Sequence, residues 1–281
     1  MTNVTVIGLG AMGRKMADVY IERGYDVSVW NRTPERAAGL KAKLLDSPAQ
    51  AGDLVIISQV DYQAMYDSFG EADLTGKTLV NLSSDTPERL REAARWVADR
   101  GGRLVTGGIM VPPPGIGTPV SYVFYSGAPV EEHREALSVL GDVQYVGEDP
   151  GLAMLYYQSM LYIFWSTLTS FMHASALMGS AERLLPYAGA MVRGLAEDGP
   201  MAFLPILAKS IEAGIYPGEE NNLHMQAVGM EHIVEASRDA GLDTTVPEAL
   251  KDLFHQAVRL GHGGDGLASV VEAIKAGSRR G

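Results

Sequence analysis

The sequence predicts an α/β fold with an N-terminal Rossmann-type doubly wound sheet, a long connecting helix and a C-terminal all-helical domain. Over the first half of the chain, short runs of Val, Ile and Leu alternate with amphipathic helical stretches. This alternation is typical of parallel strands that are covered on both faces. The strands stop after Gly147, and only helical stretches follow. We therefore expect a first domain over residues 1–149, a connecting helix over 150–178 and a helical domain over 179–281.

The expected elements follow from hydrophobic periodicity and from turn residues. The expected strands cover residues 4–8, 26–30, 53–58, 77–83, 102–108, 120–127 and 143–147. The later helices are expected at about 182–197, 200–213, 219–240, 246–260 and 265–277. Asp149 and Pro150 suit the cap and the first position of the connecting helix, which would be about 40 Å long at 1.5 Å per residue.

Composition excludes several classes of function. The chain has 281 residues, 46% of them apolar, a net charge of −11 and no cysteine. An acidic protein does not suit general nucleic-acid binding or docking on anionic membranes. Without cysteine there is no disulfide or thiolate nucleophile, and the six histidines lack ligand spacing, so we expect no metal site. The N-terminus lacks the features of a signal peptide, and we expect a cytoplasmic protein.

The connecting helix is uncharged from Gly151 to Ala181. A membrane span needs about 20 apolar residues, but polar residues interrupt this run, so we expect a helix buried in a soluble protein. The C-terminal part of the chain is too short to cover such a helix on every side. We therefore expect a homodimer, with the alternative that the helical domain folds back and covers the helix alone.

A glycine pattern, G-x-G-x-x-G, lies between the first expected strand and the first amphipathic helix. Its residues are Gly8, Leu9, Gly10, Ala11, Met12 and Gly13. In this setting the first glycine permits a tight turn, the second lets a pyrophosphate approach the backbone, and the third allows close helix–strand packing. The helix N-terminus adds amide donors and a positive dipole. The pattern predicts a dinucleotide-binding site.

The end of the second strand indicates which dinucleotide is bound. An acidic residue would bind the ribose 2′-hydroxyl of NADH, but this strand is followed by Asn31, Arg32 and Thr33, with Arg36 one turn further. Guanidinium groups suit a 2′-phosphate, and Asn31 and Thr33 can add hydrogen bonds. The sequence therefore favours NADPH, the alternative being that both arginines are ordinary surface charges.

Ser83 follows the strand expected at residues 77–83. The carboxyl ends of strands in a doubly wound sheet face the ligand crevice. We expect Ser83 to approach the nicotinamide side of the cofactor, although a plain turn serine has the same pattern.

Two adjacent tyrosines, Tyr156 and Tyr157, lie near the start of the connecting helix. They point about 100° apart, because an α-helix has 3.6 residues per turn. The residues on or near the face of Tyr157 are Met154, Met160, Leu161, Phe164 and Trp165. Periodicity alone leaves open which face meets the nicotinamide, and whether Tyr157 is a core tyrosine.

Several segments together resemble the NADPH-dependent imine reductases, which are relatives of the β-hydroxyacid dehydrogenases. The resemblance covers nearly the whole chain. It is carried by the glycine pattern, the N-R-T ending, GGIMVPPPGIGTP (107–119), GEDPGLAMLYY (147–157), IEAGIYPG (211–218), MEHIVEASRDAGLDTTVPEAL (230–250) and AVRLGHGGDGLASVVEAI (257–274).

The resemblance implies that Tyr157 is the catalytic residue. The related dehydrogenases place a lysine on this helix six residues after a glycine; counted from Gly151, that position holds Tyr157. Imine reductases typically have Asp or Tyr there, so Tyr156 is expected to pack in the interior. An iminium substrate already carries a positive charge, and a neutral phenol can orient or protonate its nitrogen without repelling it.

The expected product is an amine, formed from a cyclic imine or from an imine made in place from a ketone and an amine. In this family the tyrosine-bearing group tends toward S-configured products. The expected pocket lies between one subunit's α/β domain and the other subunit's helical domain. Its expected apolar lining is Met110, Met160, Leu161 and Trp165, with Trp165 as a core aromatic in the alternative interpretation.

Two rival functions stay open at this point. A β-hydroxyacid dehydrogenase would reduce a small carbonyl acid, but position 157 holds no lysine and residues 107–119 contain no Lys or Arg to bind a carboxylate. A non-catalytic protein that binds NADPH would turn over neither imines nor carbonyl compounds.

Overall fold

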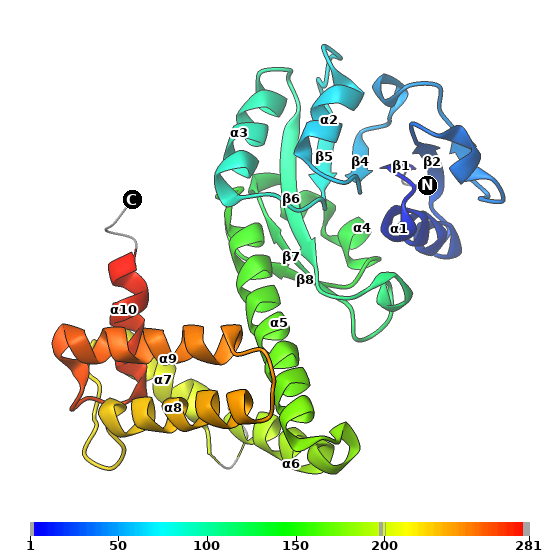
Figure 1. Ribbon diagram of the computed structural model, residues 1–281. Coiled ribbons are helices and arrows are strands. Elements are labelled where there is room, and N and C mark those ends of the chain that lie inside the picture. The colour runs from blue at the N-terminus through cyan, green and yellow to red at the C-terminus, as the bar shows by residue number, and fades with distance from the viewer. Residues whose placement is uncertain (1–2, 197–198, 200, 278–281) are drawn as a thin grey trace. The chain divides into compact units, whose positions relative to one another are not determined.

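The computed structural model describes residues 3–196, 199 and 201–277. The chain forms two compact units, residues 1–164 and 165–281, and helix α5 (Leu152–Met178) extends through the boundary (Figure 1). The first unit contains the sheet and the second is helical, as the fold class predicted from the sequence requires. The finer division at residues 149 and 178 stays a prediction.

The sheet has eight strands in the order β3-β2-β1-β4-β5-β6-β7-β8. All neighbouring pairs are parallel except β6 and β7, which are antiparallel. The strands are β1 (Asn3–Ile7), β2 (Asp26–Trp30), β3 (Lys43–Leu44), β4 (Leu54–Ile57), β5 (Thr78–Asn81), β6 (Arg103–Ile109), β7 (Tyr122–Ser126) and β8 (Asp142–Tyr145). The strand order reverses at β1, between β2 and β4, and this switch point is where open α/β sheets bind ligands.

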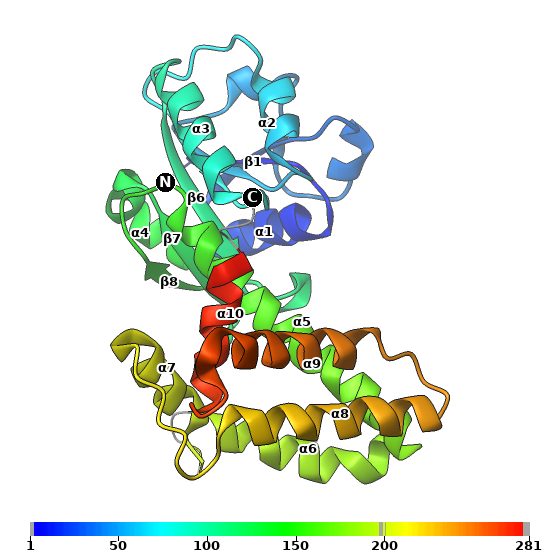
Figure 2. The same ribbon diagram turned by 60° about the vertical axis from the view of Figure 1, so that its left-hand side comes forward.

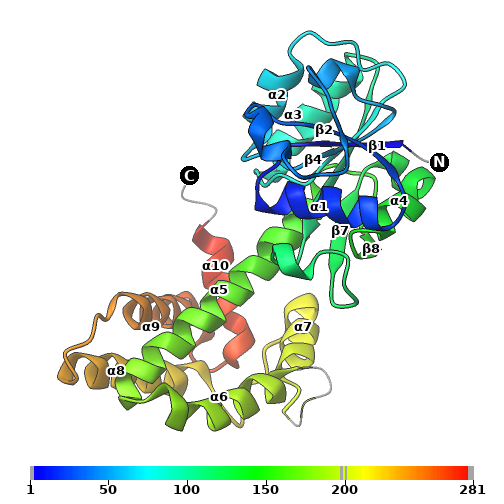
Figure 3. The same ribbon diagram turned by 90° about the vertical axis from the view of Figure 1, so that its right-hand side faces the viewer.

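Two layers of helices cover the sheet. On one face, α1 (Ala11–Glu22) and α4 (Arg134–Ser138) pack against the valines of β1 and β2. On the other face, α2 (Tyr62–Phe69), α3 (Pro87–Ala98) and the first turns of α5 pack against β4, β5 and β6. Figure 3 shows α1 on one side of the sheet and α2 and α3 on the other. The buried Val, Ile and Leu runs thus form the middle of a three-layer domain.

The start of α5 differs from the expected one. The helix begins at Leu152, and Asp149 and Pro150 lie in the turn before it. The Asp149 carboxylate binds the Arg91 guanidinium through two hydrogen bonds and also accepts one from the Gly151 amide. Asp149 is therefore held by α3, and the prediction that Pro150 is the first residue of the helix is wrong.

The second unit contains five further α-helices among the described residues. They are α6 (Ala181–Leu195), α7 (Phe203–Ala213), α8 (Leu223–Asp239), α9 (Thr245–Ala257) and α10 (Val270–Gly277). Helices α8 and α9 lie side by side (Figure 2).

Short 3₁₀ turns occur in both units, at Pro34–Ala37, Pro48–Gln50, Pro113–Gly115, Ala128–His133 and Leu267–Ser269, and a π turn lies at Val258–His262. Within the described part of the chain, no helix is both long and apolar enough to cross a membrane.

Candidate active site

The turn between β1 and α1 carries three glycines, and its backbone needs glycine at the first and the third of them. Gly8 has a φ of +93°, and a Cβ atom there would overlap the carbonyl oxygen of Ser58. A Cβ atom on Gly13 would overlap the carbonyl oxygen of Gly8, so α1 lies directly on the turn. Gly10, which caps α1, has no atom within 4 Å of its Cβ position. The first and third glycines thus allow the chain to fold, whereas the second leaves open space at the N-terminus of the helix.

Asn31 connects this turn to the loop that follows β2. Its side-chain oxygen accepts a hydrogen bond of 2.8 Å from the Leu9 amide, and its side-chain nitrogen donates one of 2.9 Å to the Thr33 carbonyl. Asn31 therefore holds the two loops together, and its direct contact with a cofactor phosphate stays a prediction.

A cavity of about 870 Å³ opens above the switch point of the sheet. It is bounded by the β1–α1 turn, the loop after β2 and the segment from the end of β4 into α2. Its lining residues are Gly8, Gly10, Ala11, Met12, Trp30, Asn31, Arg32, Thr33, Arg36, Ser58, Gln59, Val60, Asp61, Gln63, Ala64, Asp67 and Ser68. Of the predicted cofactor-binding residues, Leu9, Gly13 and Ser83 are outside this lining.

Arg32 and Arg36 are both exposed and both line the cavity. Within the described residues, neither guanidinium is bound to a carboxylate, so both can meet an anion. Together with the open space at Gly10 and the amides at the start of α1, they fit a dinucleotide that carries a 2′-phosphate.

Arg14 is a residue that sequence reasoning missed. Its guanidinium donates to the carbonyl oxygens of Arg36 at 2.7 Å and Ala38 at 2.9 Å. It thereby fixes the loop that carries Arg36. A basic residue one position after the last glycine of the motif is the only signal, and it does not reveal a bond to a loop more than twenty residues away.

Gln59 is a second missed residue. It follows β4, where its side-chain nitrogen donates to the Ser68 hydroxyl at 2.8 Å, and its side-chain oxygen is buried without a hydrogen-bond partner among the described residues. Gln59 lines the cavity, and its side-chain oxygen is a buried acceptor still without a donor in the described part of the chain. The carboxyl end of the strand expected at 53–58 was the signal that could have identified it.

Ser83 lies beneath the cavity wall and is 3% exposed. Its hydroxyl accepts a hydrogen bond of 3.1 Å from the Gln59 amide, and its own amide donates to the side chain of Asn81. Ser83 thus supports the position of Gln59, and its approach to the nicotinamide stays a prediction.

Tyr157 lies over the carboxyl half of β6. Its side chain is half-buried against the cluster that joins α3, β4 and β6. A Cβ atom on Gly108 would come within 2.6 Å of both Cβ and Cγ of Tyr157, so only glycine leaves room for the ring. Burial raises the pKa of the phenol above its ordinary value of 10, and the hydroxyl is therefore neutral at physiological pH.

Tyr156 does not pack in the interior, so that prediction is wrong. Its side chain is 46% exposed, and its ring lies 5.3 Å from the ring of Phe124 on β7. The two tyrosines do point in different directions, because the helix turns by about 100° between them. The ring that packs on the sheet is that of Tyr157.

The predicted pocket residues lie in both units. Met110 is at the end of β6, where its amide donates to the Tyr122 carbonyl, and Met160 and Leu161 are half-buried on α5. Trp165 belongs to the second unit and is 60% exposed, so it is not a core aromatic of this chain. Their shared role in a substrate pocket stays a prediction.

Two family models match the chain. The NAD binding domain of 6-phosphogluconate dehydrogenase matches residues 3–110, and the NADPH-dependent reductive aminase-like C-terminal domain matches residues 149–276. A relative, the NADPH-dependent reductive aminase of Aspergillus oryzae (strain ATCC 42149 / RIB 40), is 34% identical over 98% of both chains.

Solved structures show the same similarity. An imine reductase of Streptomyces aurantiacus is 43% identical, with a TM-score of 0.91 over 97% of this chain and 99% of that one. A reductive aminase of Aspergillus terreus, in complex with NADPH4, cyclohexanone and allyl amine, is 33% identical, with a TM-score of 0.89 over 97% and 99%. The chain therefore belongs to the family of NADPH-dependent imine reductases and reductive aminases.

Proposed function

We propose that this protein reduces C=N bonds, including those formed from a ketone and an amine, and that Tyr157 is the polar group at the reacting centre. The observation that carries the proposal is a neutral phenol fixed over β6 where the related dehydrogenases have an ammonium group. The helix on which it lies has no Asp, Glu, Lys or Arg from Leu152 to Met178. Such surroundings suit an organic cation better than a carboxylate anion.

When bound, NADPH supplies the hydride that adds to the carbon of the C=N bond. Arg32 and Arg36 would hold the 2′-phosphate of the cofactor, and the backbone amides of the glycine turn would hold its pyrophosphate. With a neutral imine the Tyr157 hydroxyl donates a hydrogen bond to the lone pair of the substrate nitrogen, and with a protonated iminium its oxygen accepts one from the N–H group. Either bond orients the C=N bond. Because its pKa is raised, the phenol keeps its proton until the nitrogen becomes basic.

Removing the hydroxyl tests this role. In Tyr157→Phe we expect kcat with a cyclic imine to fall about a hundredfold, the range for loss of a positioned acid, while the dissociation constant of NADPH stays the same. Tyr145→Phe is the control, because that ring is exposed on the edge strand β8 and lies off α5, and its kcat should equal that of the parent. A parent-like kcat in Tyr157→Phe would remove the phenol from the mechanism.

The substrate class is tested by a direct comparison. The enzyme should oxidise NADPH with a cyclic imine much faster than with a semialdehyde acid of similar size. The reverse preference would favour the dehydrogenase function, and no turnover of either compound would favour a protein that only binds the cofactor.

The choice of cofactor depends on Arg32 and Arg36. Replacing either residue by alanine should reduce the preference for NADPH over NADH about tenfold or more, because a charge-assisted hydrogen bond to phosphate contributes about 1.5–3 kcal/mol. Dissociation constants of both cofactors, measured by fluorescence titration, give the preference. Arg23→Ala, at the far end of α1, is the control and should leave both constants unchanged.

A homodimer, with its pocket between one subunit's α/β domain and its partner's helical domain, is part of the proposal. It is supported by apolar side chains on α5 that are between 36% and 77% exposed. These side chains are Leu155, Tyr156, Tyr162, Ile163, Phe164, Trp165, Leu168, Met172, Leu177 and Met178. Exposed apolar area of this extent marks an interface rather than a solvated face.

Sedimentation measures the assembly directly. The parent should have twice the chain mass of 30.1 kDa, and Met172→Asp should shift it toward the monomer. Val120→Asp replaces an exposed apolar side chain of the first unit and should stay dimeric. A monomeric parent would contradict the proposed assembly.

A further inference from the structure

Two buried hydroxyl groups connect the sheet to the start of α5. Thr106 on β6 and Ser126 on β7 are direct partners in the antiparallel register, and both are 0% exposed. Their side-chain oxygens lie 2.8 Å apart. The Thr106 hydroxyl also bonds to the Pro150 carbonyl at 2.6 Å, and the Ser126 hydroxyl lies 3.2 Å from the same carbonyl. The Ala153 amide donates to the Ser126 hydroxyl at 3.1 Å.

The distances indicate how the protons of this bridge are shared. Each hydroxyl has one proton to donate, and the shortest bond assigns the Thr106 proton to the Pro150 carbonyl. Ser126 accepts from the Ala153 amide, and its own proton has two acceptors in reach, the Thr106 oxygen at 2.8 Å and the Pro150 carbonyl at 3.2 Å. In either case the bonds join an amide in the first turn of α5 to the carbonyl of Pro150 in the turn before the helix. Ser126, at the end of β7, thus satisfies a helix amide that a local capping residue usually satisfies.

The bridge and Tyr157 share one face of β6. Side chains at alternate positions of a strand point the same way, so Leu104, Thr106 and Gly108 all face α5. Leu104 belongs to a hydrophobic cluster that also contains Met154, and Tyr157 packs against this cluster. Thr106 binds the Pro150 carbonyl, and Gly108 leaves room for the Tyr157 ring. The same strand therefore fixes both where α5 starts and where its second turn rests.

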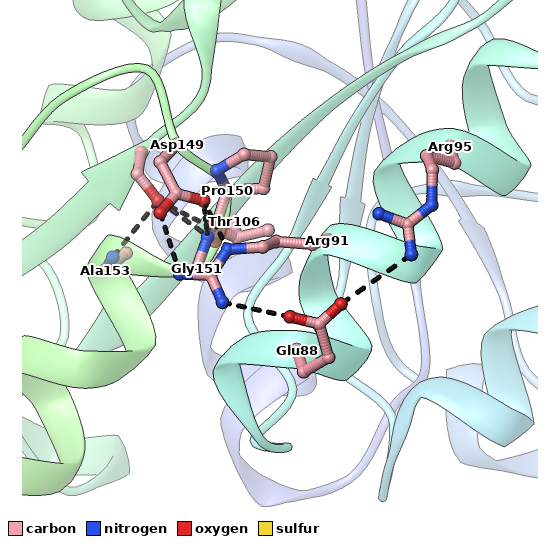
Figure 4. Close-up of polar contacts among 9 residues, drawn as sticks. Glu88, Arg91, Arg95, Thr106, Asp149, Pro150, Gly151 and Ala153 are labelled. Atoms are coloured by element: carbon pink, nitrogen blue, oxygen red, sulfur yellow. Dashed lines mark hydrogen bonds and ion pairs between the residues drawn. The ribbon is translucent and has the colours of Figure 1, made fainter.

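An ion pair on the surface contributes less to this anchoring. Figure 4 shows Arg91 between Asp149 and Glu88, at the outer side of the same turn. The Arg91 and Asp149 side chains are 36% and 39% exposed, and water and salt weaken ion pairs of this kind. A buried hydroxyl that loses its partner is costlier, so the hydroxyl bridge dominates.

We propose that Thr106 and Ser126 are positioning residues of the reduction: their hydroxyl bridge sets the height of α5 over β6 and thereby the place of the Tyr157 hydroxyl. The inference rests on the proposed function of Tyr157. It assigns a role in turnover to two side chains that lie outside the lining of the cofactor cavity.

Thr106→Val keeps the shape of the side chain and removes the hydroxyl, whereas Thr106→Ser keeps the hydroxyl. We expect kcat with a cyclic imine to fall about tenfold in Thr106→Val and in Ser126→Ala, because even a small displacement of a catalytic group lowers the rate of the chemical step. Thr106→Ser should restore kcat to near the parent value. The dissociation constant of NADPH, measured by fluorescence, should be the same in all three variants.

Combination with Tyr157→Phe separates positioning from general stability. If the bridge acts through the Tyr157 hydroxyl, Thr106→Val should lower kcat with tyrosine at 157 but not with phenylalanine. Equal falls in both backgrounds would overturn the positioning role and leave that of Tyr157 intact. An unchanged kcat in Tyr157→Phe alone would overturn the proposed role of Tyr157, while the reduction of C=N bonds would stand. Circular dichroism confirms folding, and Ser126→Ala carries the same comparison if Thr106→Val does not fold.

Discussion

Replacing Gly13 by alanine is expected to lower the free energy of unfolding by about 3 kcal/mol, because the new methyl group overlaps a backbone carbonyl that cannot move without shifting α1 from β1. The Gly13→Ala variant should also lose NADPH binding, since the amides at the start of α1 would move away from the position of the pyrophosphate. Urea denaturation and a cofactor titration measure the two effects.

Gly10→Ala is the matched control for Gly13→Ala. Its Cβ position is open and its φ of −69° suits alanine, so the free energy of unfolding should stay that of the parent. NADPH binding should still weaken about tenfold or more, because the methyl group occupies the space left for the pyrophosphate. Equal stability of the two variants would contradict the assignment of separate roles to the two glycines.

Gly108→Ala is expected to lower kcat about a hundredfold, the cost of moving a catalytic group by about 1 Å. The new Cβ atom would lie 2.6 Å from Cβ and Cγ of Tyr157, so the ring and the helix turn beneath it must move outward. The cofactor cavity is formed by other segments, and the dissociation constant of NADPH should therefore change little. Steady-state kinetics with saturating NADPH measures the loss.

Gly52→Ala serves as the control for Gly108→Ala. The atoms nearest to its Cβ position are at ordinary contact distance, from 3.4 Å, and belong to Asn3 and Thr5. Its kcat should equal that of the parent. A parent-like kcat in Gly108→Ala as well would show that the position of the Tyr157 ring does not limit turnover.

The parallel strands and the glycine turn could be predicted because their signals are local. A continuous apolar run and a G-x-G-x-x-G pattern between strand and helix are each contained within a few residues. The short strand β3 was missed, since two residues give no periodicity and it forms only by pairing with β2. Local patterns identified the elements around the cavity but not the weakest edge of the sheet.

The errors at α5 have a different cause. The sequence pattern predicts Asp149 as a helix cap, but its carboxylate binds Arg91, which lies 58 residues earlier in the chain. The Ala153 amide of the helix donates to the Ser126 hydroxyl instead. Arg14 fixes the loop of Arg36 in the same non-local way. The burial of Tyr157 rather than Tyr156 depends on Gly108, which lies on a strand far back in the sequence. Contacts of this kind follow only from the folded chain.

The reversed direction of β7 has a consequence for how this enzyme class diversifies. Because β7 and β8 run antiparallel to β6, the chain leaves β8 at the amino edge of the other parallel strands, and α5 then runs along β6 toward its carboxyl end. Position 157, the proposed reacting position, thus lies on the second turn of a helix rather than on a loop. Its backbone is fixed by residues other than itself, so a single codon change can exchange ammonium, carboxylate or phenol there while the scaffold stays constant.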